Sequence, residues 1–195
     1  MQAQGYSDAG GRWNDWLIVE PSQTFADHAR ASTLPHLRVV QGFFEDLADR
    51  VPREIDVLLC SGLLHEVPDS DRLIAAMRRQ MTTETVLHIN VPNAASLHRQ
   101  LASAMGLIDD VKAISPRNAS LQQPRVYDLP DLTAQLRRHG LAITDTGGHL
   151  VKPFTHRQME PLVDALGRDV MNGLYKLGKR MPELASEIFV EAQIF

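Results

Sequence analysis

The stretch that decides the fold is Ile55-Asp-Val-Leu-Leu-Cys-Ser-Gly-Leu-Leu-His-Glu-Val67. Its first six residues form a short, nearly continuous apolar run with β-branched members, which is typical of a strand buried on both faces. A polar step then leads into a helix. Ligands bind just beyond the carboxyl ends of the strands in an open parallel α/β sheet. The pattern therefore predicts a site at the residues that close the run, which are Cys60, Ser61, Gly62 and His65.

Strands and helices alternate on both sides of this stretch. Apolar runs predict strands at residues 16–19, 37–40, 55–60, 85–91, 141–146 and 187–195. Apolar residues at helical spacing predict helices at residues 22–30, 71–81, 94–105, 130–139, 157–166 and 170–177. The alternation predicts right-handed βαβ units, and therefore an α/β fold with a mainly parallel sheet.

The segments between these elements carry expectations of their own. Residues 1–15 are polar and glycine-rich, so we expect them to be irregular. Residues 106–125 form a long polar connection that could serve as a lid or substrate loop. Gly147-Gly148 is typical of a turn. No repeat or linker divides the chain, which predicts a single domain over residues 1–195.

Composition argues against several classes of protein. The chain has 195 residues, is 44% hydrophobic and has a formal net charge of −4, with no basic cluster for nucleic acid. Its one cysteine excludes a disulfide framework and a cysteine-based zinc cage within one chain. No apolar run approaches the ~20 residues that a membrane span needs, and the N-terminus does not resemble a secretory signal. We expect a cytoplasmic protein without a metal site.

Several motifs follow one another along the chain in a specific order and spacing. These are Val19-Glu-Pro-Ser22, Gly42-Phe-Phe-Glu-Asp-Leu47, residues 56–67, residues 91–100 with 105–108, Arg125-Val-Tyr-Asp128, and Leu177-Gly178 with Glu187-Ile188. Through these motifs the chain resembles class I S-adenosylmethionine-dependent methyltransferases from residue 16 to residue 195. The resemblance implies a Rossmann-like sheet with helices on both faces, an antiparallel C-terminal strand, and S-adenosylmethionine as the cofactor.

Several residues match positions that hold the cofactor in this family: Glu20, Phe44, Glu45, Asp46, Cys60, Ser61 and Leu63. The resemblance implies that Glu20 accepts hydrogen bonds from the ribose, for which a carboxylate has two acceptor oxygens. Glu45 and Asp46 would accept from the adenine amino group, and Phe44 would cover the ring. The alternatives are a solvated acid at position 20, two acids that stabilise the start of a short helix, and a core phenylalanine.

His65 is the candidate catalytic residue. An oxygen or nitrogen methyl acceptor needs a base, and histidine titrates in the useful range. The alternative is a loop histidine that bonds to the backbone at the helix start. A second polar set could bind a small-molecule or sugar-like acceptor that is anionic or hydroxylated: Asn93, His98, Arg99, Arg125 and Tyr127. The alternative for His98 and Arg99 is a place on the solvated face of their helix.

The sequence departs from the family at its N-terminal side. In the family a first strand, central in the sheet, ends in a glycine-rich loop whose N–H groups meet the cofactor. Too few residues precede the strand at 16–19 for both features. We therefore expect an N-terminally shortened member with weak cofactor binding and two free strand edges, which a second copy or a partner chain would cover. The alternative is a non-catalytic or repurposed member that has lost cofactor binding and works through a partner or self-association.

Overall fold

The computed structural model describes residues 2–47, 50–52 and 54–195. The chain divides into two compact units, residues 1–52 and residues 53–195, and each is described here by itself. The single domain over residues 1–195 stays a prediction. The class of fold is confirmed, because both units combine helices with sheets that contain parallel strands.

The first unit is built on two parallel strands. In chain order it contains α1 (Gln2–Asp8), β1 (Trp16–Glu20), α2 (Gln23–Arg30), β2 (Leu37–Gln41) and α3 (Phe44–Leu47). β1 and β2 pair in register from Trp16↔Leu37 to Glu20↔Gln41. The Ser22 Oγ accepts a hydrogen bond from the Phe25 N–H and so caps α2. The helix contacts both strands, and Ala26 and Ala29 are buried.

The prediction that residues 1–15 are irregular is wrong for Gln2–Asp8, which form the helix α1, whereas residues 9–15 lie in no helix or strand. Aromatic contacts hold this helix to the start of β1. The Tyr6 ring lies 6.1 Å from the Trp13 ring and 5.8 Å from the Trp16 ring, and the two tryptophans are 5.2 Å apart. A Cβ at Gly11 would lie 2.3 Å from the Tyr6 ring, so glycine leaves room for this cluster. Contacts among these three aromatic rings thus stabilise a short helix that helix propensity alone does not predict.

The second unit is built on four strands in the order β3-β4-β6-β5. Its elements are β3 (Val57–Ser61), α4 (Ser70–Gln80), β4 (Val86–Pro92), α5 (Leu97–Ala104), α6 (Pro116–Ser120), α7 (Leu129–Arg138), β5 (Ala142–His149), α8 (His156–Arg180), η2 (Pro182–Leu184) and β6 (Glu187–Gln193). β3 and β4 are parallel, and β6 is antiparallel to both β4 and β5. The predicted antiparallel C-terminal strand is therefore confirmed.

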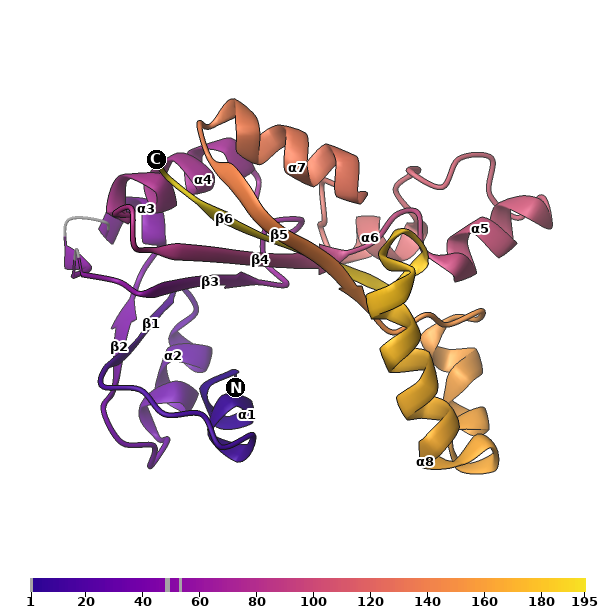
Figure 1. The fold of residues 1–195 in the computed structure, drawn as a ribbon, viewed down its shortest axis with the longest axis horizontal. Coiled ribbons are helices and arrows are strands. Elements are labelled where there is room, and N and C mark those ends of the chain that lie inside the picture. The colour runs from indigo at the N-terminus through magenta and orange to yellow at the C-terminus, as the bar shows by residue number, and fades with distance from the viewer. Residues whose placement is uncertain (1, 48–49, 53) are drawn as a thin grey trace. The chain divides into compact units, whose positions relative to one another are not determined.

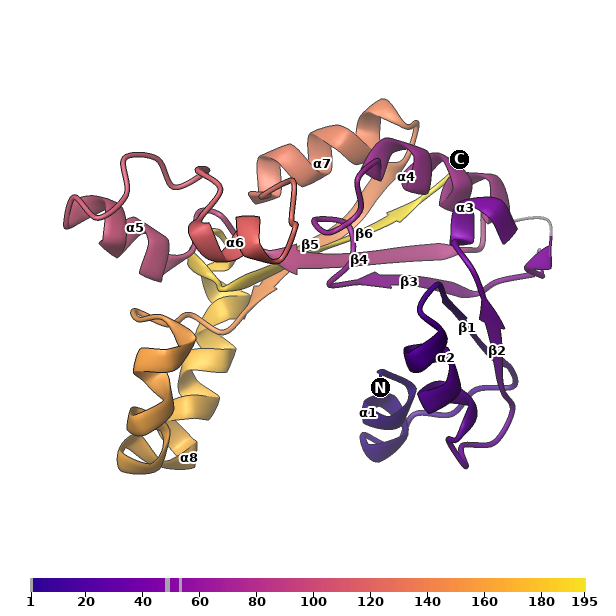
Figure 2. The ribbon, with the colours of Figure 1, turned by 180° about the vertical axis from the view of Figure 1, so that it is seen from behind.

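Helices α4 and α7 lie along one face of this sheet (Figures 1 and 2). Their apolar side chains and one face of the strands form the core: Leu58, Cys60, Leu73, Ile74, Met77, Leu87, Ile89, Val91, Leu132, Leu136, Ile188 and Val190. Both helices begin at an aspartate whose carboxylate accepts a backbone N–H, Asp69 from Arg72 and Asp128 from Asp131. The opposite face of β3 is open, since Val57 and Leu59 are 54% and 42% exposed.

The C-terminal part confirms one prediction and corrects another. α8 is kinked at Gly167, which has φ of 75°, so it consists of two helical halves, as the sequence predicts. The turn predicted at Gly147-Gly148 is wrong, because both glycines lie inside β5. A Cβ at Gly147 would lie 2.5 Å from the Phe189 ring, and one at Gly148 would lie 2.5 Å from the Ala185 Cβ. These glycines therefore allow close packing rather than a reversal of the chain.

Candidate functional site

The loop after β3 carries His65 into the interior of the second unit. Gly62 has φ of 63°, a left-handed conformation that glycine adopts without strain, and its N–H donates to the Asn90 carbonyl at 2.9 Å. This turn ends β3 at Ser61, and Leu64 and His65 follow as buried residues. Leu63 is 41% exposed at the same turn, whereas Cys60 is buried in the strand.

His65 is held as a neutral imidazole. The residue is 5% exposed, and its Nδ1 has no hydrogen-bond partner among the described residues. Burial lowers the pKa of His65, while the carboxylates of Glu66 and Glu187 act in the opposite direction. The His65 Nε2 lies 3.7 Å from the Glu66 Oε1. A neutral imidazole beside a carboxylate has the protonation state and the neighbour that a general base requires.

Glu66 is connected to the long segment between α5 and α7. The Gln123 Nε2 donates to the Glu66 Oε1 at 2.9 Å, and the Asn118 Nδ2 donates to the Gln123 Oε1 at 2.7 Å. Sequence reasoning did not identify Gln123, because its contact spans 57 residues and no local pattern marks it. The predicted lid or substrate loop thus reaches the loop that carries His65.

Three residues of the predicted acceptor set make contacts that hold the fold together. The Asn93 Nδ2 donates to the carbonyls of Glu183 and Ala185, both at 2.9 Å, in a buried position. The Arg99 Nε and Nη2 donate at 2.7 Å to two backbone carbonyls of the long connection. The Tyr127 hydroxyl donates to the Ser70 Oγ at 3.2 Å. The geometry favours a structural role for these three.

The other two residues of that set have different surroundings. His98 is half-buried, and burial together with Lys152 and Arg99 lowers its pKa to about 4. Arg125 is exposed and makes no ion pair or hydrogen bond within the described part of the chain. Arg125 lines a pocket of the second unit.

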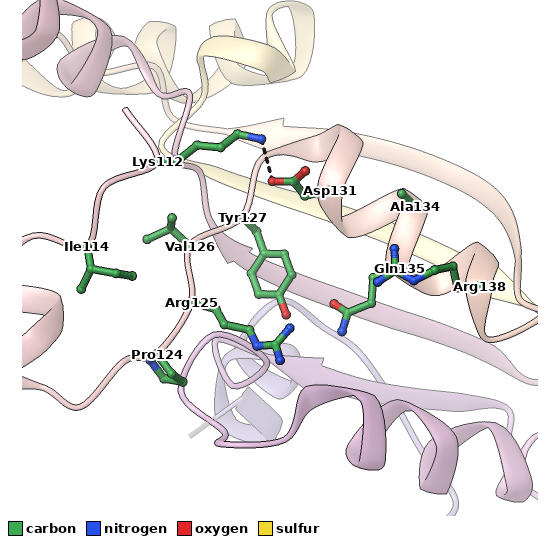
Figure 3. A pocket seen from close by; sticks show the side chains of 10 residues that line it. All are labelled: Lys112, Ile114, Pro124, Arg125, Val126, Tyr127, Asp131, Ala134, Gln135 and Arg138. Atoms are coloured by element: carbon green, nitrogen blue, oxygen red, sulfur yellow. Dashed lines mark hydrogen bonds and ion pairs between the residues drawn. The ribbon is translucent and has the colours of Figure 1, made fainter. Parts of the chain in front are cut away.

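This pocket, which we call the α7 pocket, has a volume of about 420 Å³. It lies between α7 and the segments at residues 112–114 and 124–127, and its polar lining residues are Lys112, Arg125, Tyr127, Asp131, Gln135 and Arg138 (Figure 3). The Lys112 Nζ is 2.7 Å from both Asp131 Oδ2 and Asp128 Oδ2. Sequence reasoning identified Arg125 and Tyr127 but missed the buried Gln135 and the exposed Arg138, which both lie on α7.

The first unit brings most of the predicted cofactor residues to one edge of its sheet. Glu20 is the last residue of β1, and the Gly42 N–H donates to the Glu20 carbonyl at 3.1 Å. This bond sets Glu20 beside the turn that leads into α3, which carries Phe44, Glu45 and Asp46. The Glu20 Oε1 accepts the Ser22 N–H at 2.9 Å. Cys60, Ser61 and Leu63 belong to the second unit.

Among the residues that the structure describes, no three histidine, cysteine, aspartate or glutamate side chains are grouped so as to hold a metal ion. No described helix combines the length and apolar character needed to cross a bilayer.

The fold is that of S-adenosylmethionine-dependent methyltransferases. A chain from the complex between the Haloferax volcanii Trm112 methyltransferase activator and a methyltransferase aligns with 98% of this chain and 76% of its own length, with 13% identity and a TM-score of 0.61. The Mesorhizobium loti S-adenosylmethionine-dependent methyltransferase aligns with 98% of this chain and 85% of its own, with 15% identity and a TM-score of 0.61.

The plantazolicin methyltransferase BamL, solved with a triazolic desmethylPZN analog and SAH, aligns with 99% of this chain and 73% of its own, with 10% identity and a TM-score of 0.60. At these identities the likeness establishes the fold alone. No protein-family model matches the sequence. No curated protein matches it either.

Proposed function

We propose that this protein is a methyltransferase that uses S-adenosylmethionine and acts on a small-molecule acceptor. The observation that carries the proposal is the buried, neutral His65, which follows the carboxyl end of β3 in a methyltransferase fold. Ligands bind beyond this end of the strands in such sheets. The fold alone would not support the proposal, since one fold serves many functions.

The residues of the first unit fit the ribose and adenine of the cofactor. One oxygen of the Glu20 carboxylate accepts the Ser22 N–H, which orients the side chain, and the other oxygen can accept from a ribose hydroxyl. Phe44 is half-buried beside the half-buried Glu45, so a ring face and a carboxylate are available together. A cofactor role for Cys60, Ser61 and Leu63 stays a prediction from the resemblance. When bound, S-adenosylmethionine supplies an electrophilic methyl group on a sulfonium.

His65 would remove the proton from the acceptor oxygen or nitrogen as the methyl group is transferred. The proton would move to a ring nitrogen, and the nearby Glu66 carboxylate would stabilise the imidazolium. The rest of the chain's contribution is alignment of the acceptor and exclusion of water. The contact from Gln123 to Glu66 gives the long connection a part in this alignment.

We also propose that another strand completes the sheet of the second unit, from a second copy or a partner chain. Within the described residues β3 pairs only with β4, so its other edge has no strand partner. The exposed Val57 and Leu59 lie on this edge strand. An apolar strand with a free edge is a template for pairing with another chain. The same holds for β1, which pairs only with β2 in the described part.

Calorimetric titration with S-adenosylhomocysteine tests the cofactor assignment directly. We expect saturable binding that Glu20→Gln weakens by about 1–3 kcal/mol, because a charge-assisted hydrogen bond is lost. His65→Ala should leave this binding unchanged and lower methyl transfer. The absence of binding, with and without a partner chain, would favour a repurposed fold. Equal binding by the wild type and Glu20→Gln would refute the ribose contact.

A further inference from the structure

The α7 pocket has an excess of positive charge that the protein does not neutralise. Its lining carries three cations, Lys112, Arg125 and Arg138, and one carboxylate, Asp131. Lys112 is committed to Asp131 and Asp128 at 2.7 Å. The guanidinium groups of Arg125 and Arg138 form no ion pair within 4.0 Å in the described part of the chain. The whole chain has a formal net charge of −4, so this local excess opposes the overall balance.

Arg125 lowers the pKa of the Asp71 carboxylate, but Asp71 has other hydrogen-bond partners. Asp71 Oδ1 lies 2.9 Å from the Gln135 Nε2 and 2.8 Å from the His139 Nε2. These two bonds are the main reason that the pKa of Asp71 is lowered, and Arg125 adds only at a distance. Two planar, forked donors that remain open at one pocket favour a carboxylate or a phosphate as the ligand.

The side chain of Gln135 is a second, independent indication of which ligand the pocket would bind. It is 2% exposed, and its Nε2 donates to the Ser70 Oγ and to the Asp71 Oδ1, both at 2.9 Å. A carboxylate only accepts, so the amide nitrogen must face Asp71, which fixes the orientation of the amide. The Gln135 Oε1 is buried and has no partner among the described residues. A buried acceptor without a donor is costly, and a ligand hydroxyl or amine would satisfy it.

We propose that the α7 pocket binds the anionic end of a hydroxylated small molecule, with Arg125 and Arg138 on the carboxylate or phosphate and the Gln135 Oε1 accepting from a neighbouring hydroxyl. The volume of about 420 Å³ lies within the range of about 300–1,000 Å³ usual for small-molecule sites. The Asn93↔Tyr127 bridge joins the wall of this pocket to the segment that follows β4. Binding of this ligand to the α7 pocket does not depend on the proposed function. Its identification as the methyl acceptor does rest on that proposed function.

Titration of the full chain by calorimetry and NMR tests the site without any cofactor. The probes are D-glucuronate and D-glucose 6-phosphate, with neutral D-glucose, acetate and inorganic phosphate as comparisons. We expect one or both sugar acids to bind at least tenfold more tightly than glucose and than the anion that lacks hydroxyls. Preference between glucuronate and glucose 6-phosphate separates a carboxylate site from a phosphate site.

Variants on α7 provide a matched comparison. Arg138→Ala and Arg125→Ala should each weaken the sugar acid at least tenfold. Arg137→Ala removes an exposed guanidinium from the same helix outside the pocket and should have no effect. The proposal would be overturned if neither sugar acid showed binding up to 10 mM. It would also be overturned if Arg137→Ala and Arg138→Ala weakened the affinity equally.

The two proposals can fail separately. If the sugar acid binds and S-adenosylhomocysteine does not, the α7 pocket stands and the methyltransferase assignment fails. If S-adenosylhomocysteine binds and none of the acids does, the methyltransferase assignment stands and the α7 pocket fails.

Discussion

At the scale of the residue, His65 combines two opposing influences on one ring. Burial lowers its pKa, and Glu66, 3.7 Å from its Nε2, raises it. The buried position keeps the imidazole neutral and able to take a proton, while the carboxylate stabilises the protonated form once it is made. A loop histidine with a purely structural role needs only the first of these conditions.

We predict that Glu66→Gln shifts the pKa of His65 further down, because a charge that favours the imidazolium is removed. NMR titration of the His65 ring measures this shift. If His65 is the base, the acid limb of the pH–rate profile moves to lower pH as well. Glu84→Gln, at an exposed acid before β4, is the matched control and should change neither quantity.

The lowered pKa of His98 makes the free energy of unfolding depend on pH. The unfolded chain binds a proton at His98 with a pKa near 6.5, whereas the folded chain binds one only near pH 4. The unfolded state therefore holds more protons in this window, and the free energy of unfolding falls as the pH drops from about 6.5 to about 4. The full difference corresponds to roughly 3 kcal/mol, which screening at this half-buried site reduces to about 1–2 kcal/mol.

Urea unfolding at pH 7 and at pH 4.5 measures this loss. His98→Gln should reduce the difference between the two pH values, since the titrating group is gone. His65 and His149, whose pKa values burial also lowers, contribute with the same sign and should retain part of the effect. An unchanged pH dependence in the His98 variant would contradict the assignment.

At the scale of the element, the docking of α8 depends on one glycine. A Cβ at Gly178 would lie 2.4 Å from the Leu150 backbone N and 2.6 Å from the His149 carbonyl carbon. The Val151 N–H donates to the Leu174 carbonyl at 2.9 Å one turn away. The C-terminal half of α8 is thus fixed against the end of β5 by backbone contact that leaves no space for a side chain.

We predict that Gly178→Ala destabilises the protein by about 1–3 kcal/mol, because backbone atoms must move apart. Gly173→Ala is a matched control on the same helix, since nothing lies within 4 Å of its added Cβ. That variant should be neutral or stabilising by up to about 1 kcal/mol, as expected for glycine to alanine in an exposed helix. Chemical denaturation of both variants measures the change in the free energy of unfolding. Equal changes in the two variants would contradict the close backbone contact at Gly178.

At the scale of the whole molecule, the free edge of β3 is the feature that bears on assembly. β3 has exposed Val57 and Leu59 on one face, and β4 is its only strand partner in the described residues. Charged residues on an edge strand oppose pairing between chains. This strand carries none between Val57 and Ser61.

We predict that the purified chain self-associates and that Leu59→Lys shifts it toward the monomer, because a charge on the open face of β3 must be desolvated in the assembly. Sedimentation velocity over a range of concentrations measures the change. Leu107→Lys, at a 68% exposed leucine in the long connection, is the control and should leave association unchanged. A wild-type chain that is monomeric at all concentrations would show that β3 needs a different partner or none.

The sequence by itself determined the α/β class and the order of the strands and of the longer helices, and its resemblance to a known family indicated the antiparallel final strand. Hydrophobic periodicity reports burial within one element, and the run ending at Cys60 and the apolar spacing of α4 are of this kind. The kink of α8 also follows locally, from Gly167. His65 and Arg125 were identifiable because each is a polar residue that follows or interrupts a recognisable pattern.

Only the tertiary structure decided which polar groups meet. The contact of Gln123 with Glu66 spans 57 residues, and that of Gln135 with Ser70 spans 65. The helix α1 depends on Tyr6 packing against Trp13 and Trp16, and the course of Gly147-Gly148 depends on Phe189. A local pattern cannot encode such contacts, because their energy comes from atoms that are neighbours only once the chain has folded.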